Sequence, residues 1–131
     1  MNKVIDVTFP GGKKVYARIN DRIIHTDQTI ENGGEGTAPE PFHLFVASIA
    51  TCAGVYALEF CQTREIPSEG MGLTMTYEWD ERKQACQKFN INLILPPGFP
   101  DKYKKAVIRV MDLCAVKRHI VNPPEFIITA D

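Results

Sequence analysis

One long apolar stretch fixes the centre of any fold that this chain can adopt. Residues 42–58 carry no Asp, Glu, Lys or Arg, and Pro41 before them suits the first turn of a helix, where its missing N–H costs nothing. Apolar residues recur there at spacings of four, three and four positions, which places them on one helical face. These are Phe45, Ile49, Cys52 and Tyr56. We therefore expect a helix from residue 41 to about residue 64, apolar nearly all round and enclosed by other elements.

Segments typical of strands lie on both sides of this helix. A loop rich in glycine and proline is expected over residues 28–41. Asp101 is expected to cap a second helix, and residues 114–121 are expected to form a short third helix. The order mixes antiparallel hairpins with helices, so the expected fold class is α+β. The expected strands cover residues 4–7, 15–19, 22–26, 73–79, 89–95 and 125–129.

Length and charge set the broad class of the protein. With 131 residues, the chain is expected to form a single domain over residues 1–131. Fifteen basic and sixteen acidic side chains leave no electrostatic signal for nucleic acid or an anionic membrane. The first residues contain no apolar segment of the kind found in a signal peptide, so we do not expect secretion. His43, Ser48 and Thr51 interrupt the long apolar stretch, which we expect to be too short and too mixed to span a bilayer. A cytoplasmic protein is expected, in which cysteines are free or catalytic thiols more often than disulfides.

Cys52 and Cys114 are the candidate reactive thiols. Cys52 lies in the middle of the long helix, and Cys114 begins the short helical turn, so one could attack a peroxide and the other could resolve the product. A free cysteine titrates near ~8.5 and burial raises that value, so an active Cys52 needs a nearby cation or donated hydrogen bonds. Cys114 has Lys117 and Arg118 close in sequence, which predicts a lowered pKa. The alternative for either residue is a buried, inert thiol.

The remaining candidates are weaker. Cys61 lies nine positions from Cys52, roughly on the opposite side of the helix, and is expected to pack, whereas Cys86 follows a polar turn and is expected to be exposed. Phe42, Phe45 and Tyr56 are either core or the wall of an apolar substrate pocket. A zinc site is not expected, because no Cys-x-x-Cys or His-x-x-x-His spacing supports one. The residues considered for it are Cys52, Cys114, His43 and His119.

Three motifs, in order along the chain, resemble the OsmC/Ohr family of osmotically inducible and organic hydroperoxide resistance proteins. Gly36-Thr37-Ala38-Pro39 resembles the lead into that family's central helix. Leu44 through Cys52 resembles its apolar helix with the first cysteine, and Cys114-Ala115-Val116 resembles its second-cysteine motif, with Ala115 in place of the usual proline. The resemblance covers essentially the whole chain.

The resemblance implies antiparallel sheets around a long central helix in an intertwined homodimer. Cys52 matches the peroxidatic cysteine, which attacks a small organic hydroperoxide, and Cys114 matches the resolving cysteine. An external dithiol then reduces the disulfide, and no cofactor is needed.

The chain departs from the family pattern at one functional position. Peroxidases of this family carry a glutamate ten residues before the first cysteine, paired with an arginine from the N-terminal strands, and here that position is Phe42. Glu40 lies two positions earlier, in the loop, and could replace it if the loop is arranged differently. The activating cation is one of Lys14, Arg18 and Arg22, of which Arg18 is preferred. The competing hypothesis is a non-peroxidatic member that binds a small apolar ligand or acts as a redox-sensitive module.

Overall fold

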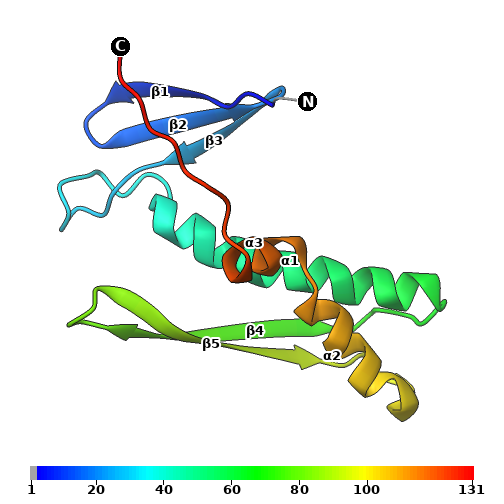
Figure 1. Cartoon of the computed structure of the whole chain (residues 1–131). Coiled ribbons are helices and arrows are strands. Elements are labelled where there is room, and N and C mark those ends of the chain that lie inside the picture. Colours follow the sequence, from blue (N-terminus) through cyan, green and yellow to red (C-terminus); the bar gives the residue numbers. More distant parts are fainter. Residues whose placement is uncertain (1–2) are drawn as a thin grey trace. The chain divides into compact units, whose positions relative to one another are not determined.

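The structure is a computed structural model that describes residues 3–131, and these divide into two units, one ending at Ala47 and the other spanning Ser48–Asp131 (Figure 1). The elements combine antiparallel strands with helices, which is the α+β class expected from the sequence. In chain order they are β1 (Asp6–Gly11), β2 (Lys14–Ile19), β3 (Arg22–Thr26), α1 (Pro41–Thr63), β4 (Gly72–Asp80), β5 (Ala85–Ile94), the 3-10 turn η1 (Asp101–Tyr103), α2 (Lys104–Asp112) and α3 (Ala115–Val121).

The N-terminal unit is built on an antiparallel sheet in the order β1-β2-β3. Tyr16 on β2 pairs with Thr8 on one side and His25 on the other. Pro10 is tolerated within β1 because β1 is an edge strand and its register shifts between Thr8 and Gly11. Glycine is needed in the turn that follows, where Gly12 has a φ of +58°.

The loop after β3 is organised by the buried carboxylate of Asp27. Its oxygens accept the backbone N–H groups of Gln28 at 2.7 Å, Glu35 at 3.3 Å and Thr37 at 3.1 Å. The Thr37 hydroxyl donates a further bond at 2.7 Å, and this bond above all lowers the pKa of Asp27 to about 2. The loop also needs Gly34, because a Cβ there would lie 2.1 Å from the Gln28 carbonyl oxygen. These contacts fix the approach to α1.

Helix α1 runs over 23 residues, as the sequence predicts. It ends where Glu65 adopts a φ of +54° and the Ile66 N–H bonds back to the Cys61 carbonyl at 2.8 Å. By length and composition it could cross a membrane, with a mean hydropathy of 1.8 over its most apolar window, so the expectation that this stretch is too short was wrong. The core helices of soluble proteins meet the same criterion. A third of that apolar window of α1 is buried within the structure.

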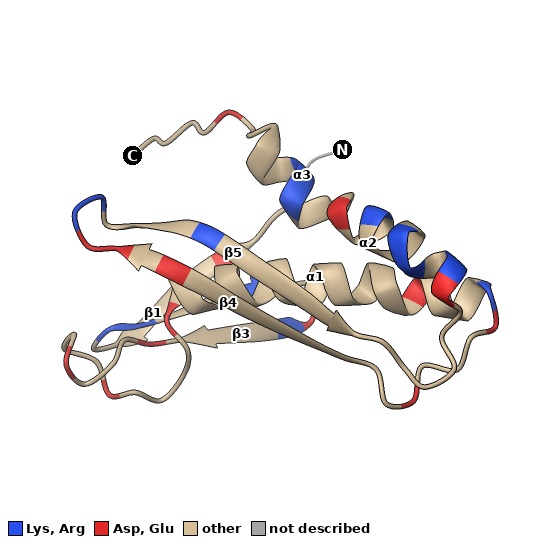
Figure 2. Cartoon of the chain, turned by 90° about the horizontal axis from the view of Figure 1, so that it is seen from below, with Lys and Arg blue, Asp and Glu red and all other residues tan. Residues whose placement is uncertain are grey.

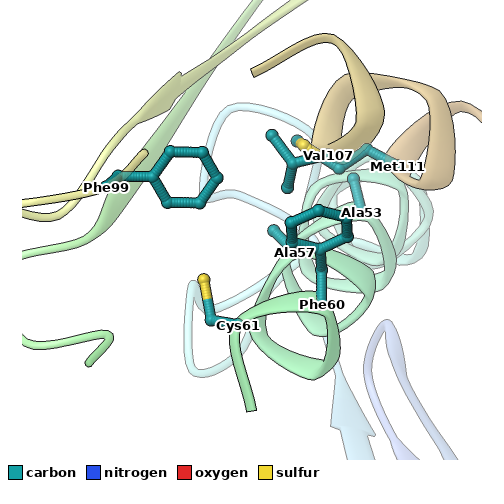
Figure 3. Packing of buried hydrophobic residues seen from close by; sticks show 7 residues of the cluster. All are labelled: Ala53, Ala57, Phe60, Cys61, Phe99, Val107 and Met111. Atoms are coloured by element: carbon teal, nitrogen blue, oxygen red, sulfur yellow. The ribbon is translucent and has the colours of Figure 1, made fainter. Parts of the chain in front are cut away.

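The core of the C-terminal unit forms where α1 meets α2 and the β4-β5 hairpin. Short side chains on α1, Ala53 and Ala57, allow Val107 and Met111 of α2 to approach closely (Figure 3). The hairpin and the turn after it contribute Leu73, Leu93 and Phe99. The buried cluster consists of Ala53, Ala57, Phe60, Cys61, Phe99, Val107 and Met111.

Charged side chains are unevenly distributed over this unit. Figure 2 shows them along α2, at the start of α3 and around the turn between β4 and β5, whereas the middle of α1 has none.

Asp101 pairs with Lys104 at 3.2 Å but lies inside η1 and makes no cap hydrogen bond, so the expected cap was wrong.

The chain after α3 differs from the expectation. Residues 123–131 adopt no helix or strand, so the strand expected at 125–129 does not form within the chain. Phe126, Ile127 and Ile128 are 81%, 78% and 93% exposed. The apolar, β-branched pattern predicted a strand, but within residues 3–131 no strand pairs with this segment.

Candidate thiol site

The fold brings Cys52 and Cys114 together within the C-terminal unit. Cys52 lies close enough to raise the pKa of the Cys114 thiol. Cys52 is half-buried on α1, and Cys114 is 2% exposed at the junction of α2 and α3. Both are free thiols. Two residues far apart in sequence thus form a dithiol site, although Cys52 is less enclosed than the helix pattern suggested.

Cys114 is held in place by the break between α2 and α3. The Cys114 N–H bonds to the Met111 carbonyl at 3.3 Å, which closes α2. Cys114 then becomes the N-cap of α3, and its sulfur accepts the Lys117 N–H at 3.4 Å. The Lys117 ammonium group pairs with Asp112 across the same break. The lysine therefore gives the sulfur a backbone hydrogen bond and directs its side-chain charge to a carboxylate.

Burial raises the pKa of Cys114, with Cys52 adding to the increase and the Lys117 N–H opposing it. The lowered pKa expected from the neighbouring cations was therefore wrong. Sequence proximity to Lys117 and Arg118 did not reveal that the thiol is buried or that Asp112 pairs with the lysine. Cys114 keeps its proton at neutral pH.

The activating residues expected from the sequence lie in the unit that ends at Ala47. Arg18 on β2 is exposed and forms an ion pair with Asp6 on β1 at 3.4 Å. Glu40 is half-buried immediately before α1, where its backbone carbonyl accepts the Leu44 N–H at 3.2 Å. Their action on Cys52 remains a prediction.

The expected aromatic lining separates into two parts. Phe42 and Phe45 are 37% and 42% exposed, and their ring centroids lie 5.9 Å apart. Tyr56, one helical turn after Cys52, lines an open hollow of about 260 Å³ between α1 and α2. The Arg64 guanidinium stacks over the Phe60 ring beside it, 3.6 Å from the centroid. The hollow is lined by Tyr56, Glu59, Phe60, Thr63, Arg64, Val110 and Leu113.

Sequence reasoning missed this hollow because its walls come from two helices whose packing no local pattern specifies. Leu113, which directly precedes Cys114, is 56% exposed at one edge of it. Tyr56 and Leu113 thus belong both to the lining of the hollow and to the segments that carry Cys52 and Cys114.

The other thiols take structural positions. Cys61 is fully buried in the core, as expected, and burial raises its pKa (Figure 3). Cys86 lies inside β5 opposite Trp79 and is half-buried, so the exposed position expected for it was wrong. Within residues 3–131, no group of three or more His, Cys, Asp or Glu side chains is placed to hold a metal ion.

Comparison with known proteins identifies the fold. Three solved structures share the fold. A protein of the osmotic stress and detoxification response from Psychrobacter arcticus has a TM-score of 0.76 at 22% identity, over 90% of this chain and 87% of that one. The organic hydroperoxide resistance protein OsmC of Legionella pneumophila has a TM-score of 0.61 at 19% identity, over 92% and 89%. The organic hydroperoxide resistance protein OhrB of Bacillus subtilis has a TM-score of 0.56 at 17% identity, over 92% of each chain.

A search of curated proteins finds no significant match. The family model described as OsmC-like protein matches residues 34–129, which include the loop before α1, both cysteines of the dithiol site and the segment after α3. This match spans most of the sequence, and the protein therefore belongs to the OsmC-like family.

Proposed function

We propose that the protein is a thiol-dependent organic hydroperoxide reductase that uses Cys52 and Cys114. The observation that supports this most directly is that two free thiols far apart in sequence lie close enough for Cys52 to raise the pKa of Cys114. Residues near each of them, Tyr56 and Leu113, line a partly apolar hollow. Family members named for organic hydroperoxide resistance share the fold. We propose that the protein works as a cytoplasmic homodimer.

The reaction is a two-electron reduction. The Cys52 thiolate attacks an oxygen of the O–O bond, which breaks, and the departing alkoxide takes a proton to become an alcohol. Cys52 is then a sulfenic acid. The Cys114 thiol attacks its sulfur and releases water, which leaves a Cys52–Cys114 disulfide. An external dithiol reduces this bond by thiol–disulfide exchange, so the electrons come from that dithiol, and the reaction requires no bound cofactor.

The hollow beside the thiols supports an organic substrate over hydrogen peroxide. Tyr56, Val110 and Leu113 provide apolar surface for the organic group of the peroxide. Phe45 and Phe42 lie about two and three turns before Cys52 on α1 and are proposed to contribute further apolar contact.

The test is consumption of cumene hydroperoxide by the pure protein with dithiothreitol or lipoamide as the reductant. Wild type should turn over, Cys52→Ser should not, and Cys86→Ser, a matched change at a thiol outside the site, should retain full activity. Peroxide treatment should yield one disulfide, Cys52–Cys114, in peptide mass spectra. Equal activity of wild type and Cys52→Ser, or a dominant Cys61–Cys86 bridge, would contradict the proposal.

A second candidate function is a non-peroxidatic member that binds a small apolar ligand or senses redox state. Two observations favour it: Phe42 stands where the family's peroxidases carry a glutamate, and Arg18 forms an ion pair with Asp6. In that case peroxide consumption would not exceed that of Cys52→Ser, while an apolar ligand would still protect Cys52 from alkylation.

A further inference from the structure

The hollow between α1 and α2 has a guanidinium group in its lining. Arg64 directly follows Thr63, the last residue of α1, and both residues line the hollow. The Arg64 guanidinium lies 3.6 Å from the centroid of the Phe60 ring and 5.4 Å from that of the Tyr103 ring. The two rings meet edge to face, with their centroids 5.8 Å apart. Stacking on this aromatic pair holds the guanidinium plane in one place.

Most of the donors of this guanidinium are free to bind a ligand. A guanidinium has several N–H groups, and within residues 3–131 Arg64 uses one of them, from Nη1 to the Phe60 carbonyl at 3.4 Å. That bond satisfies a carbonyl group at the open end of α1, which is a structural role. No carboxylate in the described part of the chain lies within ion-pair distance of Arg64. The remaining donors are therefore available to an anion, and a stacked guanidinium suits a carboxylate in particular.

The rest of the lining suits a small apolar body. Phe60, Val110 and Leu113 give the hollow carbon surface, and Leu113 is 56% exposed. Tyr56 and Thr63 add hydroxyl groups, which can donate or accept hydrogen bonds. The volume of about 260 Å³ is just below the roughly 300–1,000 Å³ of pockets for drug-sized ligands, so the ligand must be smaller than these.

Glu59 is the one acidic side chain in this lining, and its carboxylate makes no ion pair with Arg64. An anionic head group is therefore held at Arg64 and repelled from Glu59. We propose that the hollow binds small organic carboxylates, with the apolar body on Phe60, Val110 and Leu113 and the carboxylate on the Arg64 guanidinium. This deepens the proposed function, on which it rests for the role of the ligand, because it gives the charge of the organic group that a hydroperoxide substrate would carry.

The probe is 3-phenylpropionate, and its neutral and cationic counterparts are 3-phenylpropanol and 3-phenylpropylamine. Binding is followed on the reduced protein without peroxide, by backbone amide shifts in two-dimensional NMR. We expect saturable shifts at Thr63, Arg64 and Leu113 with the carboxylate, and about tenfold weaker binding of the alcohol and the amine. Added NaCl should weaken only the carboxylate, because salt screens the charge of an exposed guanidinium. Equal affinity for the three probes, or no saturable binding of the carboxylate, would overturn the proposal.

Three variants test the charges of the lining. Arg64→Met keeps the length of the side chain without its charge and should weaken carboxylate binding about tenfold, while binding of the alcohol stays unchanged. Arg109→Met is the matched control, because it removes an exposed cation of α2 that lies outside the lining. Glu59→Gln should strengthen carboxylate binding by about two- to threefold, a gain that a damaged fold would not produce. Equal losses in Arg64→Met and Arg109→Met would overturn the proposal.

Peroxide turnover is a separate readout. Cumene hydroperoxide carries no carboxylate, so its consumption tests the proposed function alone, whereas binding of 3-phenylpropionate needs no reactive thiol and can be repeated in Cys52→Ser. A protein that consumes cumene hydroperoxide but does not prefer the carboxylate probe would refute this inference and leave the proposed function intact. A protein that prefers the carboxylate but consumes no hydroperoxide would refute the proposed function and support the binding site.

Discussion

Asp27 accepts four hydrogen bonds in the loop before α1, and its pKa of about 2 makes the loop sensitive to acid. The pKa of Asp27 is lower in the folded chain than in the unfolded chain. The ionised carboxylate therefore stabilises the folded loop fully above about pH 4, and this contribution is lost as the pH falls through about 2. Asp27→Asn should remove the dependence and speed amide exchange at Glu35 and Thr37 severalfold at pH 6. Asp21→Asn, in an exposed turn, is the control, and equal exchange in both variants would contradict this account.

Substitutions of Phe42 test whether the absence of the family's glutamate limits the reactivity of Cys52. Its side chain is 37% exposed, so a glutamate there need not bury an unpaired charge. If an arginine reaches Cys52, Phe42→Glu should anchor it and raise the alkylation rate of Cys52 at pH 6 by about tenfold. Phe42→Gln, which has the same size without the charge, should leave the rate near that of wild type. An equal increase in both variants would show that lost aromatic bulk is the cause.

At the scale of elements, alanine substitutions at two glycines are expected to change stability in opposite directions. Gly34→Ala would place a methyl group 2.1 Å from the Gln28 carbonyl oxygen and should destabilise the loop by about 2 kcal/mol. Gly54→Ala, within α1, would meet Leu73 at an ordinary 4.0 Å and should stabilise the helix by about 0.5–1 kcal/mol. Urea unfolding measures both. A loss of stability at Gly54 would contradict the expectation that its Cβ position is open.

The same elements show what sequence can and cannot predict. Long periodic segments such as α1 were predicted closely because one apolar face specifies them. The Asp27 contacts were not, because three of its four donors are backbone N–H groups, which carry no residue-type signal, and the fourth, the Thr37 hydroxyl, lies ten positions away. The pairing of Cys52 with Cys114 came from family resemblance, since no local pattern brings residues so distant together. The pKa of Cys114 was predicted with the wrong sign because burial is a property of the folded unit.

At the scale of the whole molecule, the exposed segment after α3 predicts a dimer. Phe126 and Ile128 are 81% and 93% exposed, and a second copy of the chain would bury these apolar side chains. Light scattering should give twice the 14.7 kDa of one chain. The double change Phe126→Asp and Ile128→Asp should weaken association at least tenfold, whereas Ile30→Asp, at an exposed loop position, should not. A monomeric wild type at micromolar concentration would refute this.

The burial of Cys61 has a consequence for a protein that meets oxidants. A sulfinic or sulfonic group at the centre of the core would force a charge among Ala57, Phe60 and Phe99 and loosen the contact between α1 and α2. Because that thiol is enclosed and burial raises its pKa, it stays protonated and out of reach of solvent. Oxidation is expected at the more accessible Cys52 instead, where under the proposed function Cys114 converts the sulfenic acid to a disulfide that an external dithiol reduces. The packing of α1 against α2 is thus protected from an oxidation that would disrupt it if the reactive thiol stood at position 61 instead of position 52.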